Sequence, residues 1–188
     1  RSFSYDRGVS FEIELEAPGG YNLPQTLPAV SLGNSGILPA GIASYPSAAG
    51  GETTVGPLWP FLSGYSVWAG SCEDSDPALD PGGRPSALKP PRGSTTNVDA
   101  DLQGLSLLTS RLGVPVAATV TATYAGSGSC PAGDNVLVLG TSDSNGELYS
   151  SLPYGSWTLS AVIGIETVTL AVDVTSAGPV VATLDGTI

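Results

Sequence analysis

Glycine and proline interrupt this sequence at short intervals along its whole length. Among its 188 residues, 25 are glycine and 16 are proline. Glycine weakens the interior of a helix and proline breaks it, whereas both residues are favoured in the turns that join strands. The runs between them are rich in valine, threonine and leucine and alternate apolar with polar positions, which is the period of a half-buried strand. The sequence therefore predicts an all-β fold.

The longest stretch of turn-forming and polar residues divides the chain into two parts. Residues 77–97 are rich in proline, glycine and polar side chains, and such a segment suits a semi-rigid linker or a surface excursion. We therefore expect a connector at residues 1–8, an N-terminal β domain at 9–76 and a C-terminal β-sandwich at 98–188. The expected architecture is two tandem small β-sandwich domains joined by a Pro/Gly-rich segment.

The first strand-like run, residues 9–16, alternates most regularly. Three of its even positions are glutamates, and its odd positions are all apolar: Val9, Phe11, Ile13 and Leu15. This pattern predicts a strand with one buried and one acidic face. Two uses of the strand are open. It is an ordinary strand of a sandwich, or it is an edge or donor strand through which the protein assembles with other subunits.

Two motifs in the C-terminal half have readable turn chemistry. In DSNG, Gly146 allows the left-handed backbone conformation that the turn requires. In LPYG, Pro153 and Gly155 reverse the chain. Trp157 follows directly and is predicted to enter the core as the anchor of the next strand.

These motifs lie within two longer segments, GVPVAATVTATYA at 113–125 and LGTSDSNGELYSSLPYGSWTLSA at 139–161. The segments resemble the transthyretin-like modules of bacterial surface proteins, which include the B-type repeats of collagen-binding proteins and carboxypeptidase-regulatory-like domains. The resemblance implies that the second sandwich is transthyretin-like. It says little about activity, because one fold serves many functions.

A wider resemblance covers three segments in order: LWPFLSGYSVWAGSCEDSDP at 58–77, SGSCPAGDNVLVLGTSDSNGE at 127–147 and SLPYGSWTLS at 151–160. Together they resemble the ectodomains of prepilin-type and pilus-like surface proteins of high-GC Gram-positive bacteria. The resemblance implies a structural subunit of an extracellular appendage whose partners are other copies or other appendage subunits. In that group a hydrophobic helix precedes the β domains, so membrane attachment is expected only through a segment outside this sequence.

Two cysteines lie far apart in the sequence, at Cys72 and Cys130. Such a pair is typical of one disulfide in an oxidising compartment, which favours an extracellular location. Two buried thiols are the alternative.

Acidic residues gather around the two cysteines. Carboxylates are the ligands that calcium prefers, so a calcium site is one interpretation and a solvated acidic loop is the other. The residues concerned are Glu73, Asp74, Asp76, Asp80 and Asp134.

Composition argues against several classes of function. The formal net charge is −11 and there is no histidine. Such an acidic chain is not expected to bind nucleic acid. Without histidine, a Ser-His-Asp or Cys-His site cannot form and the commonest zinc ligand is missing. Paired carboxylates such as Asp99 and Asp101 lie in a polar segment that offers no apolar pocket. We therefore expect no enzyme, and no cofactor apart from the calcium considered above.

Two tryptophans are candidates for surface contacts. Trp59 stands beside a proline, and Trp68 is out of phase with the apolar positions of its strand, so both are expected to be exposed. Exposed aromatics would suit a glycan or a host-surface ligand. The alternative function is accordingly an adhesin or a carbohydrate-binding module of a secreted or cell-wall protein.

Overall fold

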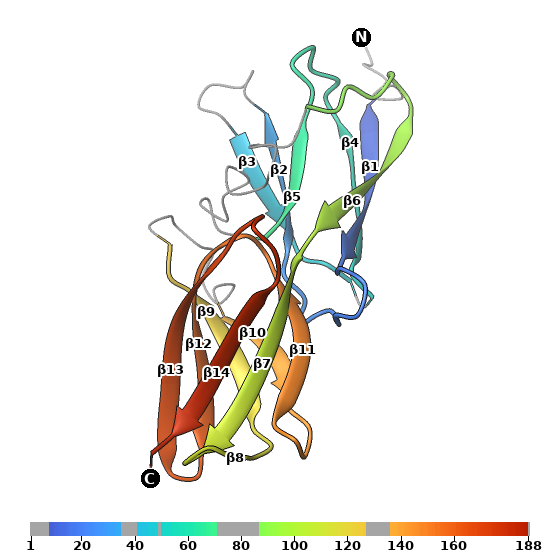
Figure 1. Cartoon of the computed structure of the whole chain (residues 1–188). Helices are drawn as coiled ribbons and strands as arrows, with labels where there is room; N and C mark the ends of the chain where they lie inside the picture. Colours follow the sequence, from blue (N-terminus) through green and yellow to red (C-terminus); the bar gives the residue numbers. More distant parts are fainter. Residues whose placement is uncertain (1–7, 35–40, 49, 71–86, 127–135, 188) are drawn as a thin grey trace.

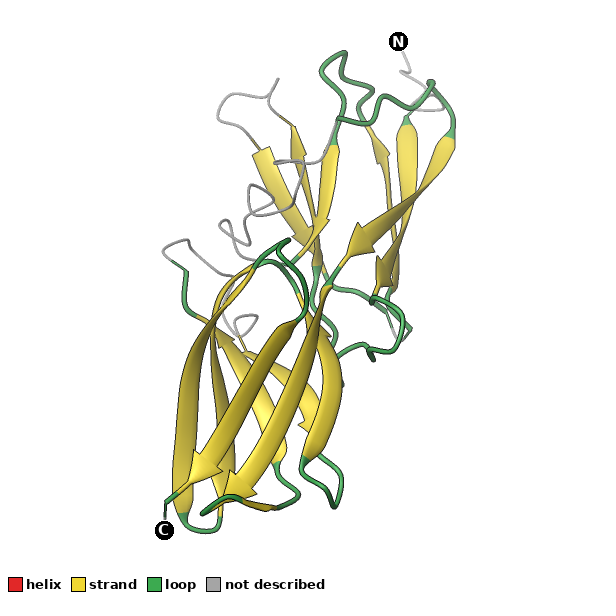
Figure 2. Ribbon diagram, in the orientation of Figure 1, coloured by secondary structure: helices red, strands yellow, loops and turns green. Residues whose placement is uncertain are grey.

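The computed structural model describes residues 8–34, 41–48, 50–70, 87–126 and 136–187. The described residues form strands, turns and loops, with no helix among them (Figures 1 and 2). The expectation of an all-β fold is confirmed. The physical basis is the alternation of apolar and polar residues in the runs between the turns, because the apolar positions of each run fall on one face of a strand.

Two sheets bury the apolar residues of the first half of the chain. Their strand orders are β4-β1-β6 and β3-β2-β5, and β1 pairs antiparallel with β4 and parallel with β6. Both sheets contribute to one hydrophobic cluster, the first cluster, which includes Phe11, Val30 and Leu102. The strands are β1 (Val9–Glu16), β2 (Val30–Asn34), β3 (Gly41–Tyr45), β4 (Glu52–Leu58), β5 (Ser66–Ala69) and β6 (Thr95–Asp101).

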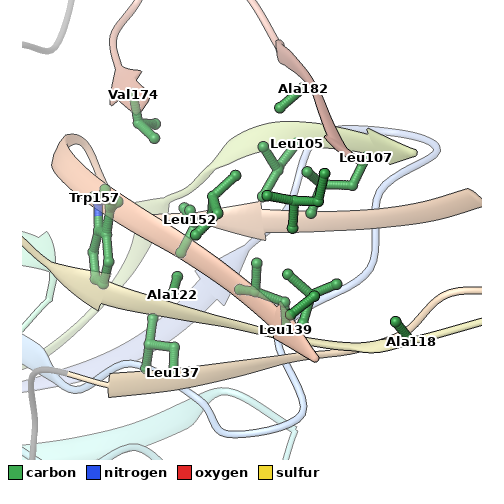
Figure 3. Packing of buried hydrophobic residues seen from close by; sticks show 14 of the residues in the cluster. Leu105, Leu107, Ala118, Ala122, Leu137, Leu139, Leu152, Trp157, Val174 and Ala182 are labelled. Atoms are coloured by element: carbon green, nitrogen blue, oxygen red, sulfur yellow. The ribbon is translucent and has the colours of Figure 1, made fainter. Parts of the chain in front are cut away.

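Two further sheets bury the apolar residues of the second half. Their orders are β10-β9-β12-β13 and β11-β7-β14, and the short β8 pairs with β7. They enclose the second cluster, which includes Leu105, Leu152 and Leu159 (Figure 3). The strands are β7 (Gln103–Arg111), β8 (Val114–Pro115), β9 (Thr119–Tyr124), β10 (Val136–Thr141), β11 (Glu147–Leu152), β12 (Gly155–Ile163), β13 (Glu166–Val174) and β14 (Val180–Gly186).

Trp157 lies in the second cluster, as its position after the turn predicts. Its side chain is 4% exposed, and its ring packs edge-on against Tyr124 with a centroid separation of 5.3 Å. The indole N–H donates to the carbonyl of Pro153 at 3.0 Å. The turn that delivers the tryptophan to the core therefore also satisfies its one polar group.

The DSNG turn between β10 and β11 has the conformation that its glycine predicts. Gly146 has a φ of 75°. The Asp143 carboxylate accepts hydrogen bonds from the backbone N–H groups of Asn145 and Glu147 at 2.8 and 2.9 Å. The Thr109 N–H donates to the Gly146 carbonyl at 2.8 Å, which fixes the turn against β7.

The sheets divide the chain at a different place from the division at residue 98. Residues 95–101 form β6 and pair with β1, and Ala100 and Leu102 belong to the first cluster. Residues 95–102, which the sequence divides between the linker and the second sandwich, therefore belong with the two sheets of the first half. A boundary placed at the segment richest in polar residues misses this return of the chain, because β6 is itself mostly polar and exposed.

Candidate assembly surfaces

The strand β1 is not an edge strand. It is hydrogen-bonded on both sides, to β4 and to β6, and its apolar residues Val9, Phe11, Ile13 and Leu15 are buried in the first cluster. This corrects the hypothesis that these residues form an assembly strand. Alternation along one run predicts which face is buried, but it carries no information on how many neighbours the strand has.

The outer face of the β4-β1-β6 sheet is acidic. Glu14 is exposed at the centre of this face, with Asp99 of β6 opposite it on one side and Glu52 of β4 on the other. One step along, Glu16 stands opposite Asp101. Directly opposed like charges destabilise a sheet. The face therefore costs the fold some stability, and it repels other acidic surfaces.

We expect Glu14→Gln to stabilise the protein by about 0.5–1 kcal/mol, because one substitution relieves two opposed like-charge pairs. Thermal unfolding measured at low and at high salt checks this, since salt screens exposed charges. Glu12→Gln is the matched control. Glu12 is equally exposed on the same strand, but its cross-strand neighbours are Thr54 and Asn97. Equal effects of the two substitutions would contradict the explanation by opposed pairs.

A loop from the first half of the chain fastens onto the second half. This loop, residues 21–26, is called the strap. The Asn22 side-chain amide donates to the Tyr149 carbonyl at 3.1 Å, and the Ser151 hydroxyl donates to the Asn22 carbonyl at 2.9 Å. Both partners belong to β11, the outer strand of its sheet. The strap therefore covers the β11 edge.

The strap also covers β10, the outer strand of the other sheet. The Thr26 N–H donates to the Val138 carbonyl at 3.1 Å, and the Val138 N–H donates to the Thr26 hydroxyl at 2.6 Å. At the other end of the strap, the Tyr21 ring lies edge-on to Tyr149 at 6.3 Å, and its hydroxyl lies 3.3 Å from that of Ser106. On this side of the second cluster, both sheet edges are therefore occupied.

Replacing Tyr21 by alanine is expected to lower the free energy of unfolding by about 1–2 kcal/mol, because the ring contacts are lost. Tyr21→Phe, the control, keeps the ring and loses only the hydroxyl contact with Ser106. Amide hydrogen exchange gives the local readout. In Tyr21→Ala, β10 and β11 should exchange faster while β12 stays protected. Unchanged protection of both edge strands would show that Tyr21 does not hold the strap.

The two predicted contact tryptophans have different environments. Trp59 is 61% exposed, in agreement with the expectation, and the neighbouring Leu62 is also exposed. The backbone carbonyl of Trp59 accepts a hydrogen bond from the Tyr65 hydroxyl at 2.6 Å. Burial, with a smaller contribution from Tyr45, raises the pKa of Tyr65.

Trp68 is 5% exposed, so it is not a surface contact, and this corrects the second expectation. It does point away from the first cluster, as the alternation indicates. The alternation of residues along a strand predicts the face of the sheet on which a side chain lies. It does not predict whether other parts of the chain cover that face. Within the described part of the chain, the buried Trp68 indole nitrogen has no hydrogen-bond partner.

Apolar side chains are exposed at the end of the second half where β7 and β12 finish. Leu112 lies in the β7–β8 turn, Val114 follows that turn, and Ile165 lies in the β12–β13 turn. The β7–β8 turn is held by Asp185. The Ser110 hydroxyl and the Gly113 N–H donate to its carboxylate at 2.7 and 3.0 Å. These two hydrogen bonds lower the pKa of Asp185.

The predicted disulfide and calcium residues lie outside the described residues, so both remain predictions. They are Cys72, Cys130, Glu73, Asp74, Asp76, Asp80 and Asp134. Within the described ranges, no group of three or more acidic or cysteine side chains is placed to hold a metal ion. The same ranges contain no helix that is long and apolar enough to cross a membrane.

Comparison with known proteins gives distant structural resemblances only. The sequence matches no protein-family model and no curated protein. The structure resembles the TIE protein of Bacillus anthracis at 15% identity and a TM-score of 0.33, covering 97% of this chain and 34% of that one. This chain therefore spans about a third of the length of that protein.

Two further similar structures are pilins. The shaft pilin SpaA of Lactobacillus rhamnosus GG is 10% identical with a TM-score of 0.32, covering 95% of this chain and 96% of that one. A variant of BcpA, the major pilin subunit of Bacillus cereus, is 7% identical with a TM-score of 0.33, covering 97% and 100%.

Proposed function

We propose that this chain is a structural subunit of an extracellular appendage, pilin-like or filament-forming, which acts through assembly and surface contacts and not through catalysis. The strap is the observation that carries the proposal. Its hydrogen bonds join a loop of the first half to outer strands of both sheets of the second half. The two halves are thereby held in an elongated arrangement (Figure 1), which suits a rigid building block.

In the proposed architecture the two clusters are the cores of two tandem β-sandwich domains, the second of them transthyretin-like. Each cluster is built by its own pair of sheets, which supports a division of the chain into two domains. The conformation of Gly146 and the burial of Trp157 support the fold assignment of the second domain, since both residues lie in the segments that carry the resemblance and take the parts predicted for them. The β6 strand then belongs to the first domain, and the boundary lies between Leu102 and Gln103.

Electron microscopy of the native cell surface, with antibodies against this chain, tests the function. Ordered filaments labelled along their length are the expected result. Labelling of a dispersed, non-filamentous protein would contradict the proposal.

The second candidate function is an adhesin or carbohydrate-binding module, and one observation favours it. Trp59 is 61% exposed, and an exposed aromatic ring can stack on the apolar face of a sugar. Binding to a glycan array that is lost in Trp59→Ala would support this function. If Trp59→Ala retained all glycan binding, the exposed Trp59 ring would no longer support the carbohydrate-binding function.

A further inference from the structure

The strand β13 is an outer strand of unusual regularity. It pairs with β12 over its whole length, from Glu166 opposite Ile163 to Val174 opposite Gly155, with no shift of register. It is last in its sheet, and no other strand of the described chain pairs with it. In Figure 1 it forms the margin of that sheet. One row of backbone N–H and C=O groups of β13 is therefore available for another strand.

The opposite margin of the same sheet is protected in two ways. The outer strand there, β10, has an irregular register between Val138 and Gly140, and Val138 is hydrogen-bonded to Thr26 of the strap. Proteins commonly block free edges with such irregularities, with covering loops, or with lysine and proline. The sequence of β13, ETVTLAVDV, has no lysine, arginine or proline. Neither an irregular register nor a lysine or proline therefore protects β13.

The side chains on the inner face of β13 are only half-buried. They are Val168, Leu170 and Val172. Their neighbours across the strand pair are Ala161, Leu159 and Trp157 of β12, which are all buried. The second cluster is thus incompletely covered along this margin. A strand added beside β13 would bury these three residues and gain apolar contact as well as backbone hydrogen bonds.

We propose that this margin binds a second copy of the chain, with β13 of each copy pairing antiparallel about a two-fold axis at Leu170. The two four-stranded sheets would then form one continuous sheet. In this register Leu170 faces Leu170 of the second copy, and Val168 faces Val172. An isologous contact of this kind needs a surface that complements itself.

The charges on β13 are compatible with a second copy as the occupant. The strand carries two charged residues, Glu166 and Asp173. In the proposed register Asp173 faces Thr167 and Glu166 faces Val174, so no like charges are opposed. The outer face of the β4-β1-β6 sheet differs, because Glu14 already opposes two carboxylates there. Two copies of that acidic face would repel each other. The role of this β13 pairing in appendage assembly rests on the proposed function.

Sedimentation equilibrium of the isolated chain over a range of concentrations tests the pairing. The wild-type chain is expected to associate reversibly to a dimer. Thr169 and Ala171 are both exposed and face each other across the proposed axis, so Thr169→Lys with Ala171→Lys would oppose two pairs of lysines. We expect the dissociation constant of this variant to rise about tenfold or more.

The matched variant combines Thr169→Lys with Ala171→Glu. It changes the same two positions but opposes a lysine to a glutamate at each, so it should dimerise about as well as the wild type. A wild-type chain that stays monomeric at every concentration would overturn the proposal, and so would a dimer that the two lysines leave unaffected. If the Lys/Glu variant dissociates as the Lys/Lys variant does, the two-fold register at Leu170 is wrong.

Expression of the Lys/Lys variant in the source cells separates this inference from the proposed function. Filaments lost in the variant but present in the Lys/Glu variant would support both. Filaments unaffected by the two lysines would overturn the β13 contact and leave the function standing. A dimer in solution with no filaments from the wild-type chain would contradict the function and leave the contact standing. A different protein bound at β13 in cross-linking would replace the second copy as occupant.

Discussion

Trp157→Ala is expected to lower the free energy of unfolding by about 3–5 kcal/mol, the range for removing a large buried aromatic side chain. The substitution empties the space beside Tyr124, and it also removes the donor that satisfies the Pro153 carbonyl. The cavity would lie between the two sheets of the second cluster (Figure 3), where collapse requires the sheets themselves to move. Equilibrium unfolding in urea measures the loss.

Trp59→Ala is the matched control for this substitution. It removes the same side chain from an exposed position, so stability should change by no more than about 0.5 kcal/mol. A large loss in both variants would mean that Trp59 has a structural role. A small loss in Trp157→Ala would mean that the second cluster refills the cavity.

Gly146→Ala is expected to destabilise the protein by at least about 2 kcal/mol. Two costs combine at this position. The left-handed backbone conformation disfavours any side chain, and a Cβ would collide with the backbone carbonyl of Thr109. That carbonyl is fixed by a hydrogen bond from the Val116 N–H at 3.1 Å, so relief requires displacement of β7 or of the turn.

Gly113→Ala separates the two costs. Gly113 has the same φ of 75°, but a Cβ there meets no atom within 4 Å. Only the unfavourable backbone conformation should destabilise this variant, and the free energy of unfolding should fall by about 1 kcal/mol. Thermal and urea unfolding of both variants give the comparison. Equal losses would show that the contact with Thr109 contributes nothing.

Local features of the sequence predict much of the fold. The all-β class follows from turn residues that frame alternating runs, and the burial of Trp157 follows from the turn before it. In both cases the information lies within a few residues. Alternation also predicts correctly that the odd positions of residues 9–16 are buried.

Features that depend on distant pairing were not predictable in this way. The place of β1 at the centre of its sheet depends on β6, whose polar sequence gives little sign that it is a strand. Trp68 is buried although its phase suggests exposure. The strap joins residues more than 110 positions apart, as in the contacts of Asn22 with Tyr149 and of Thr26 with Val138. No periodicity within either segment encodes such a contact.

The parallel strand pairs have a consequence for a chain that is pulled. Tension enters the first half at the start of β1 and leaves it at the end of β6, and these two strands are parallel neighbours. In the second half, it enters at the start of β7 and leaves at the end of β14, which are also parallel neighbours. Each pair is therefore loaded in shear, so its hydrogen bonds must break together and cannot unzip one by one. Both halves of the molecule are built to resist extension along the same line.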